Sequence, residues 1–137
     1  MIDTKFELSI CLKIETDEDI DIVSHVLGLS PTDFIVKGTR KSKVLEEAES
    51  NIWMYDVKYG TCKEIGKSLR EFLESKPQLF HKIEDLKKIG TITIRISIIS
   101  DFAQIGIGFS EEELVFLSRL QIPIEMSILS WGQCVDE

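Results

Sequence analysis

The chain has 137 residues, 43% hydrophobic and 29% charged, which is the balance of a folded domain and argues against disorder. Its formal net charge of −8 disfavours nucleic-acid binding, because the phosphates would be repelled. It contains no apolar run of the roughly 20 residues that span a bilayer, and its first residues lack a signal peptide's basic start. We therefore expect one cytoplasmic domain over residues 1–137, with 132–137 as a loose tail.

The first apolar segment is FELSICLKI, residues 6–14, in which apolar residues alternate with polar or small ones. A period of two with one apolar face predicts a strand that is covered on one side. A helix should follow, with Thr16 as its cap, acidic residues in its first turn and Gly28 in the left-handed conformation that ends it. Its buried stripe is expected to consist of Ile20, Val23, Val26 and Leu27.

Pro31 interrupts the chain, and DFIVKG, residues 33–38, predicts a short strand. Residues 37–51 are first basic and then acidic, so we expect a solvated connection there. NIWMYDVKYG, residues 51–60, predicts the next strand. Its larger side chains share one parity: Trp53, Tyr55, Val57 and Tyr59.

The strongest helix pattern covers residues 61–77, where Thr61 and Glu64 have the spacing of a capping box and Pro77 ends the helix. A shorter helix over residues 77–90 should follow and stop at Gly90.

The last part of the chain predicts two strands, a helix and a final strand. TITIRISII, residues 91–99, repeats the alternation of the first strand, and AQIGIGF, residues 103–109, should pair with it as a hairpin. Ser110 with Glu113 predicts a second capping box. IPIEMSIL, residues 122–129, predicts the closing strand, with Pro123 at its start or at a sheet edge.

These elements predict an α+β fold in the order β-α-β-β-α-α-β-β-α-β, with mostly antiparallel sheet or sheets and the helices packed on one side. Residues 16–26 and 110–120 share one pattern of hydroxyl cap, acids and apolar residues. Either the chain has two related, duplicated halves, or it uses the same helix pattern twice independently. The expected core below the helices consists of Phe6, Leu8, Ile10, Leu12, Ile92, Ile94, Ile96, Ile105, Ile107 and Ile124.

Several patterns that resemble functional motifs do not meet the requirements of those motifs. Asp17, Asp19 and Asp21 have the spacing of a calcium loop, but Ile22 and Gly28 stand where that loop needs glycine and glutamate. The three cysteines, Cys11, Cys62 and Cys134, are too scattered for a disulfide framework or a zinc site. His25 and His81 both fall on predicted helices, where we expect them at the surface or on a helix flank. We therefore predict no metal, no cofactor and no catalytic residues.

The polar faces of the strands are the less ordinary feature. If the strands share a sheet, its open side carries small polar groups and a few charges. That side is either an ordinary solvated face or a docking surface for a protein or a small polar ligand. The candidate binding residues are Lys13, Trp53, Tyr55, Arg95 and Glu125.

A set of residues around LGLSPT, KG and WMY resembles a bacterial family of domains of unknown function, number 4279, and the similarity extends to the closing IPIEMSILS. The anchoring residues are Leu27, Gly28, Pro31, Thr32, Lys37, Gly38, Trp53 and Tyr55. Similar proteins tend to have an acid and an aromatic residue near Ser127 and Leu129, where this chain departs. The resemblance implies a cytoplasmic α+β domain with no established activity, and some relatives are suspected of immunity-type roles near toxin genes.

These observations lead to two functional hypotheses. The first is a non-enzymatic protein-interaction module with a basic protein partner, since the acidic surface would steer such a partner. The second is a small polar-ligand-binding domain that uses the open sheet face. We expect a monomer or a homodimer, and a closing strand IEMSIL at a sheet edge would permit dimerisation by sheet extension.

Overall fold

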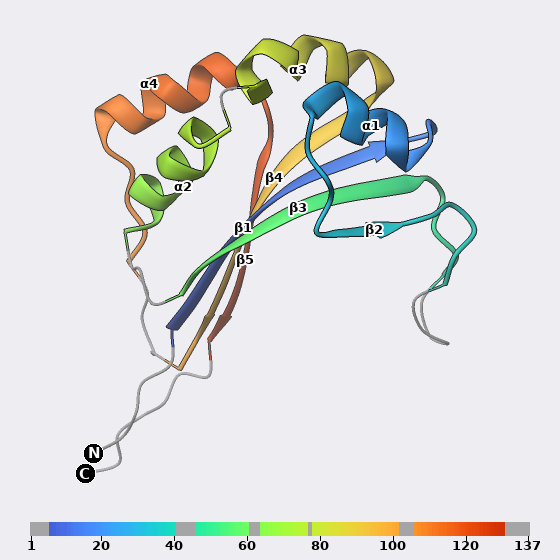
Figure 1. Cartoon of the computed structure of the whole chain (residues 1–137). Helices are drawn as coiled ribbons and strands as arrows, with labels where there is room; N and C mark the ends of the chain where they lie inside the picture. The colour runs from blue at the N-terminus through green and yellow to red at the C-terminus, as the bar shows by residue number, and fades with distance from the viewer. Residues whose placement is uncertain (1–5, 41–45, 61–63, 77, 102–105, 131–137) are drawn as a thin grey trace.

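The computed structural model describes residues 6–40, 46–60, 64–76, 78–101 and 106–130. It is an α+β structure in which helices pack on a five-stranded, mostly antiparallel sheet with strand order β2-β3-β1-β4-β5 (Figure 1). The strands are β1 (Phe6–Thr16), β2 (Asp33–Ile35), β3 (Asn51–Gly60), β4 (Gly90–Ser100) and β5 (Ile124–Ser130). The helices are α1 (Ile20–Leu27), α2 (Ile65–Glu74), α3 (Gln78–Ile89) and α4 (Glu111–Leu120).

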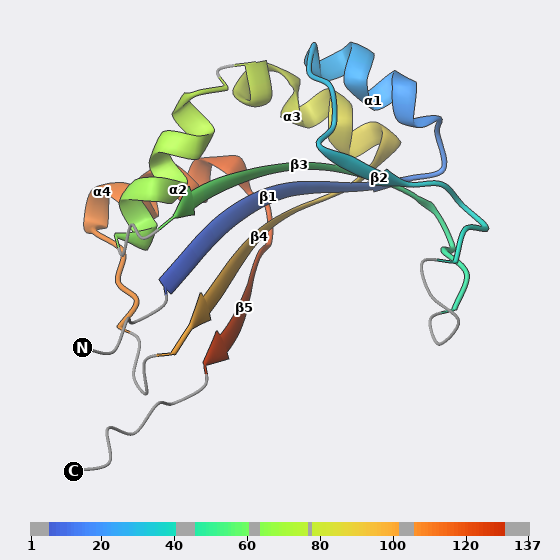
Figure 2. The same ribbon diagram turned by 60° about the horizontal axis from the view of Figure 1, so that its bottom comes forward.

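The centre of the sheet is β1, which pairs antiparallel with β3 on one side and with β4 on the other. β5 pairs parallel with β4. The strands bend along their length, and the helices gather on the outer side of this bend (Figure 2). The inner side of the sheet is therefore open, as the alternating patterns predicted.

The core lies between the sheet and the helices. Every second residue of β1 and β4 points into it, and Trp53 of β3 lies beside them. The predicted core residues of β1 and β4 are confirmed as buried, whereas Ile107 and Ile124 are partly buried and Ile105 lies outside the described residues. Buried residues of α2 close the other side: Ile65, Leu69, Phe72 and Leu73.

Two predicted helix starts are wrong. α1 begins at Ile20 after Asp19, because β1 continues through Thr16, whose hydroxyl instead accepts a hydrogen bond from the Glu18 N–H at 3.0 Å. α2 begins at Ile65, so Glu64 occupies the N-cap position itself rather than the third helical position. Thr61, its predicted partner, lies outside the described residues.

The predicted end of α1 and the start of α4 are confirmed. Gly28 ends α1 in the left-handed conformation with φ 66°. In α4, Ser110 Oγ accepts from the Glu113 N–H at 3.1 Å, and the Ser110 N–H donates to Glu113 Oε1 at 2.9 Å. These ends are encoded locally, because a cap needs only residues within one turn of it.

The predicted hairpin of residues 91–99 with 103–109 is wrong in its described part. Residues 106–109 form no strand, and residues 103–105 lie outside the described residues. The place beside β4 is taken by β5, which returns through α4 and pairs in the parallel direction. The strand after α1 lies instead at the far edge, beyond β3, so the two similar helix patterns lead to different connections.

The predicted strand 33–38 is shorter than expected. β2 ends at Ile35, and the Lys37 N–H donates to the Asn51 side-chain oxygen at 2.7 Å instead of to a strand carbonyl. Gly38 then turns the chain with φ 86°, a conformation that disfavours residues other than glycine.

Candidate functional site

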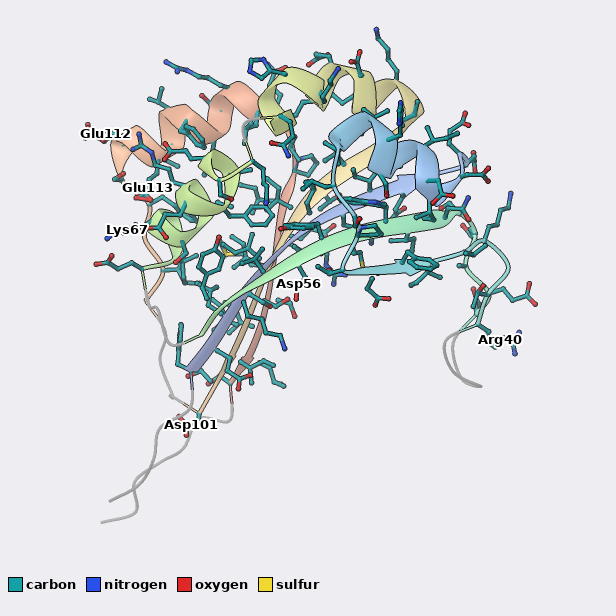
Figure 3. The ribbon with its side chains drawn as sticks, viewed as in Figure 1. Arg40, Asp56, Lys67, Asp101, Glu112 and Glu113 are labelled. Atoms are coloured by element: carbon teal, nitrogen blue, oxygen red, sulfur yellow. The ribbon has the colours of Figure 1, made fainter. Side chains whose placement is uncertain are left out.

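The open face of the sheet consists of rows of side chains that cross the strands. One row holds Lys58 on β3 followed by the serines of β1, β4 and β5, which are Ser9, Ser97 and Ser127. The next row contains Asp56, Cys11, Arg95 and Glu125 (Asp56 is labelled in Figure 3). Positive and negative groups therefore alternate across this face.

Three of the five predicted binding residues share the open face. Arg95 Nε lies 3.7 Å from Glu125 Oε2 on the neighbouring strand. Lys13 Nζ lies 2.7 Å from Glu15 Oε1. Since Arg95 and Lys13 each have a carboxylate beside them, neither residue adds an isolated positive charge to this face.

Trp53 and Tyr55 do not belong to this face, which corrects their place in the predicted binding surface. They lie opposite Ile14 and Leu12 in register, on the side covered by the helices. Trp53 is 0% exposed, and its Nε1–H donates to Ser24 Oγ on α1 at 3.0 Å. Tyr55 stacks on Trp53, with ring centroids 6.4 Å apart. Both rings join the sheet to the helices.

Cys11, at the centre of the open face, is not poised for nucleophilic chemistry. Burial, assisted by the negative charge of Asp56, raises the pKa of its thiol to about 11. Burial also raises the pKa of Asp56, which Lys58 partly opposes. A thiol with this pKa is almost fully protonated at neutral pH, so it is a poor nucleophile.

A shallow pocket of about 340 Å³ lies at one end of the open face. It combines hydroxyl groups, one lysine, one glutamate and an apolar wall, and its lining residues are Glu7, Leu8, Ser9, Lys58, Gly60, Ser97 and Ile99. Its size and mixed lining suit a small polar molecule.

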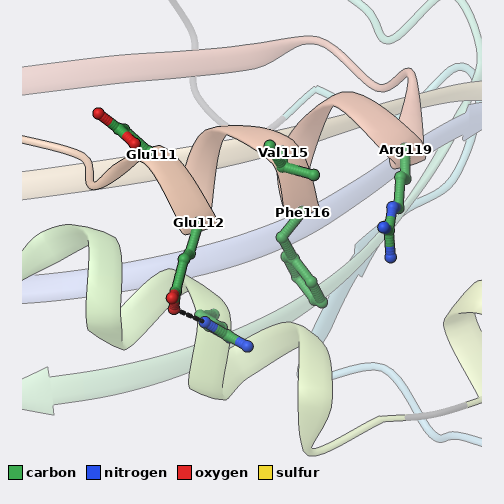
Figure 4. A pocket seen from close by; sticks show the side chains of 6 residues that line it. Glu111, Glu112, Val115, Phe116 and Arg119 are labelled. Carbon is green, nitrogen blue, oxygen red and sulfur yellow. Dashed lines mark ion pairs between the residues drawn. The ribbon is translucent and has the colours of Figure 1, made fainter.

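A second hollow, of about 570 Å³, lies where α4 meets α2 (Figure 4). Its central cation, Arg70, lies 2.9 Å from Glu74 and 3.5 Å from Glu112, and 5.6 Å above the ring centre of Phe116. These contacts join the two helices. Because they already satisfy Arg70, we assign this hollow to the packing of the helices.

A third hollow lies between α1 and β2, and we call it the α1–β2 groove. It has a volume of about 480 Å³ and is lined by Asp19, Ile20, Asp21, Pro31, Phe34, Val36 and Asn51. Phe34 is 52% exposed and Val36 is 48% exposed, so both are much more accessible than the core apolar residues. The groove therefore combines an apolar floor with two carboxylates.

The loop between α1 and β2 gives the groove its shape through specific hydrogen bonds. Thr32 Oγ1 accepts from the Asp56 N–H at 2.9 Å, and the Thr32 N–H donates to the Met54 carbonyl at 2.9 Å. Asn51, which is buried, accepts from the Lys37 N–H and donates to the Glu18 carbonyl at 2.8 Å. One side chain thus ties together the ends of β1, β2 and β3.

The family model described as Domain of unknown function (DUF4279) matches residues 3–131. The chain belongs to this family. The predicted resemblance is therefore confirmed over nearly the whole chain. No curated protein and no solved structure matches the chain.

In this DUF4279 chain, the residues that carried the resemblance have structural roles around the groove. Gly28 and Gly38 adopt positive φ, Thr32 bonds to β3, and Trp53 bonds to α1. The binding candidates nearest to them, Phe34 and Val36, were absent from the predicted set. In the sequence, only the alternate positions of Phe34 and Val36, shortly after Pro31, pointed to a shared surface. Asp19 and Asp21 come close to these two residues only in the folded chain.

Two general findings concern the described part of this DUF4279 domain. Within the described residues, no three His, Cys, Asp or Glu side chains lie close enough together to hold a metal ion. None of the helices described is long and apolar enough to cross a membrane.

Proposed function

We propose that this domain is a non-enzymatic protein-interaction module that binds a basic, partly apolar segment of a partner protein in the α1–β2 groove. The observation that carries the proposal is the pairing of exposed Phe34 and Val36 with the carboxylates of Asp19 and Asp21 in one groove. Exposed apolar side chains with a polar rim are typical of docking sites.

The two parts of the groove would contribute differently. Covering the exposed halves of Phe34 and Val36 would stabilise a complex by about 1 kcal/mol each. The aspartates, together with the net charge of −8, would mainly accelerate association with a basic partner. This acceleration weakens with salt, because exposed charges are screened beyond about 8 Å at physiological ionic strength. An immunity role, with a basic toxin as the partner, is one form of this proposal.

A titration followed by amide NMR tests the proposal with a defined probe, a short synthetic peptide that alternates arginine and leucine. We expect saturable shifts at Asp19, Asp21, Phe34 and Val36, weaker binding at high salt, and no binding of a glutamate–leucine peptide of equal length. Phe34→Ala and Asp19→Asn should each weaken binding, and Ile128→Ala, a control on β5, should not. Shifts confined to the open sheet face, or equal binding by both peptides, would contradict the proposal.

A second candidate function is the binding of a small polar ligand in the pocket at the end of the open face. Its support is the lysine and the two serines that line this pocket, Lys58, Ser9 and Ser97. A ligand that binds there raises the melting temperature by mass action. A metabolite screen by thermal shift tests this function: a hit should lose its effect in Lys58→Ala and keep it in Phe34→Ala.

A further inference from the structure

The free edge of β5 is long and apolar. Met126 is 40% exposed, Ile128 is 47% exposed and Leu129 is 58% exposed. β5 is the last strand in the sheet order, and no described strand lies beyond it. The residues of β5 whose backbone groups point away from β4, together with the exposed apolar side chains, form a template on which another strand can pair.

The edge lacks the devices by which proteins usually prevent such pairing, namely prolines, lysines, bulges and short length. Pro123 precedes the strand, and the only charged residue within it is Glu125, at its second position. The charge of Glu125 is already accompanied by Arg95 on β4. The middle and end of β5 therefore carry no charge to repel an approaching strand.

The backbone groups that point outward can be identified from the pairing with β4. The Ile94 N–H donates to the Pro123 carbonyl at 3.0 Å, and Ile94 lies opposite Ile124. Bonds in a parallel pair recur at every second residue. Residues 125, 127 and 129 thus bond to β4, and the N–H and C=O groups of Met126 and Ile128 point to the free edge.

We propose that two copies of this chain pair through β5, antiparallel, about a two-fold axis at Ser127. In this register Met126 of each copy lies opposite Ile128 of the other, and both are residues whose backbone groups point outward. Their side chains share the helix side of the sheet, so four exposed apolar side chains would meet there. Ser127 would face itself across the axis, and each Glu125 would face Leu129.

A second copy fits this edge because the pattern of β5 is self-complementary. A two-fold interface requires the same patch to match itself, and the register above pairs apolar with apolar residues while keeping the two copies of Glu125 apart. Each copy carries a net charge of −8, so copies repel elsewhere on an acidic surface. The inference does not depend on the α1–β2 groove, which lies at the opposite edge of the sheet.

Light scattering coupled to gel filtration tests the dimer. At about 100 µM, where a dimer of micromolar affinity is almost fully assembled, we expect about twice the chain mass of 15.6 kDa. Met126→Pro, which removes an outward N–H, and Ile128→Lys should each give the monomer mass with a retained circular dichroism spectrum. Phe34→Lys, which changes an equally exposed apolar residue at the other edge, should remain dimeric. A monomeric wild-type chain, or a dimer that Ile128→Lys leaves intact, overturns the proposal.

Cross-linking tests the register independently of the two β5 variants. In a chain whose three cysteines are replaced by serine, Ser127→Cys should form an intermolecular disulfide on mild oxidation, because this position faces itself. Ser118→Cys, on the exposed surface of α4, is the matched control and should stay largely monomeric. Equal cross-linking of the two variants would overturn the two-fold axis at Ser127.

Discussion

The two edges of the sheet are built in different ways. β2 has three residues and follows Pro31; two residues after its end at Ile35, the Lys37 N–H donates to the side chain of Asn51. β5 has seven residues and is held by a regular ladder to β4. Both edges expose apolar side chains, and in the described part of the chain β5 exposes them beside the outward-pointing backbone groups of Met126 and Ile128.

This difference separates two ways of binding. The β2 edge is too short to template another strand, so its apolar residues can act only through a groove that side chains from other elements complete. The β5 edge needs no further element, because a strand can add to it through backbone bonds alone. This difference is the reason why we propose a foreign partner for the first edge and a second copy for the other.

The largest loss of stability is expected when Trp53, which supports the β2 edge, is replaced. Trp53→Ala should lower the free energy of unfolding by about 3–5 kcal/mol, since it empties a fully buried site between β3 and α1. Trp53→Phe should cost less, because it mainly loses the bond to Ser24. Chemical denaturation measures both. A loss below about 1 kcal/mol for Trp53→Ala would show that the β2 edge does not depend on this ring.

Asn51→Ala should destabilise the chain by about 1–3 kcal/mol, because it leaves the Lys37 N–H and the Glu18 carbonyl without their partner. Asn51→Asp is the matched control, since it retains an acceptor for Lys37 and should lose less stability. The dimer mass should stay the same in both, as the β5 edge is remote. Equal losses in the two variants would argue against the Lys37 bond as a determinant of the β2 edge.

A pair of prolines tests the direction of the backbone groups in β5. Ser127→Pro removes an N–H that bonds to β4 and should destabilise the folded monomer by about 1–2 kcal/mol. Met126→Pro removes an outward N–H and should affect the stability of the monomer less while abolishing dimerisation. Thermal unfolding of dilute samples compares them. If Met126→Pro destabilised the monomer more, the assignment of the outward groups would be wrong.

The smallest effect on stability is expected from the Cys11 thiol, which lies on the central strand β1, away from both edges. Because the pKa of the Cys11 thiol is about 11 in the folded chain and 9.0 in the unfolded one, the thiolate should appear at higher pH in the folded chain. The contribution of this thiol to stability is therefore present below pH 9 and is lost as the pH rises through 11. Alkylation of a Cys62→Ser, Cys134→Ser variant against pH, with and without denaturant, measures both midpoints, and equal midpoints would contradict the shift.

The sequence predicted the parts of the fold that depend on neighbouring residues. Alternation in residues 6–14 and 91–99 correctly identified the two long strands and their buried faces. Ser110 with Glu113 predicted the start of α4. The prediction for Thr16 failed because a hydroxyl followed by acids suits a strand end and its turn as well as a helix cap.

The candidate site was less predictable, because it depends on how strands are matched. The alternation within β3 correctly placed Trp53 and Tyr55 on the same side of that strand. Alternation cannot show, however, which side of one strand forms a common face with which side of its neighbour. Only the register with β1 shows that both rings lie among the helices while Arg95 and Lys13 lie on the open side.

By itself, the sequence determined the class of fold, the buried faces of its long strands, the family and the net negative charge, because periodicity, capping residues and charge are local properties of the chain. The tertiary structure alone decided that β5 lies beside β4, that Phe34 meets Asp19 and Asp21 in a groove, and that β2 and β5 are the two outermost strands described. These features arise from contacts between residues far apart in the chain, and no local pattern specifies which distant partner a strand will choose.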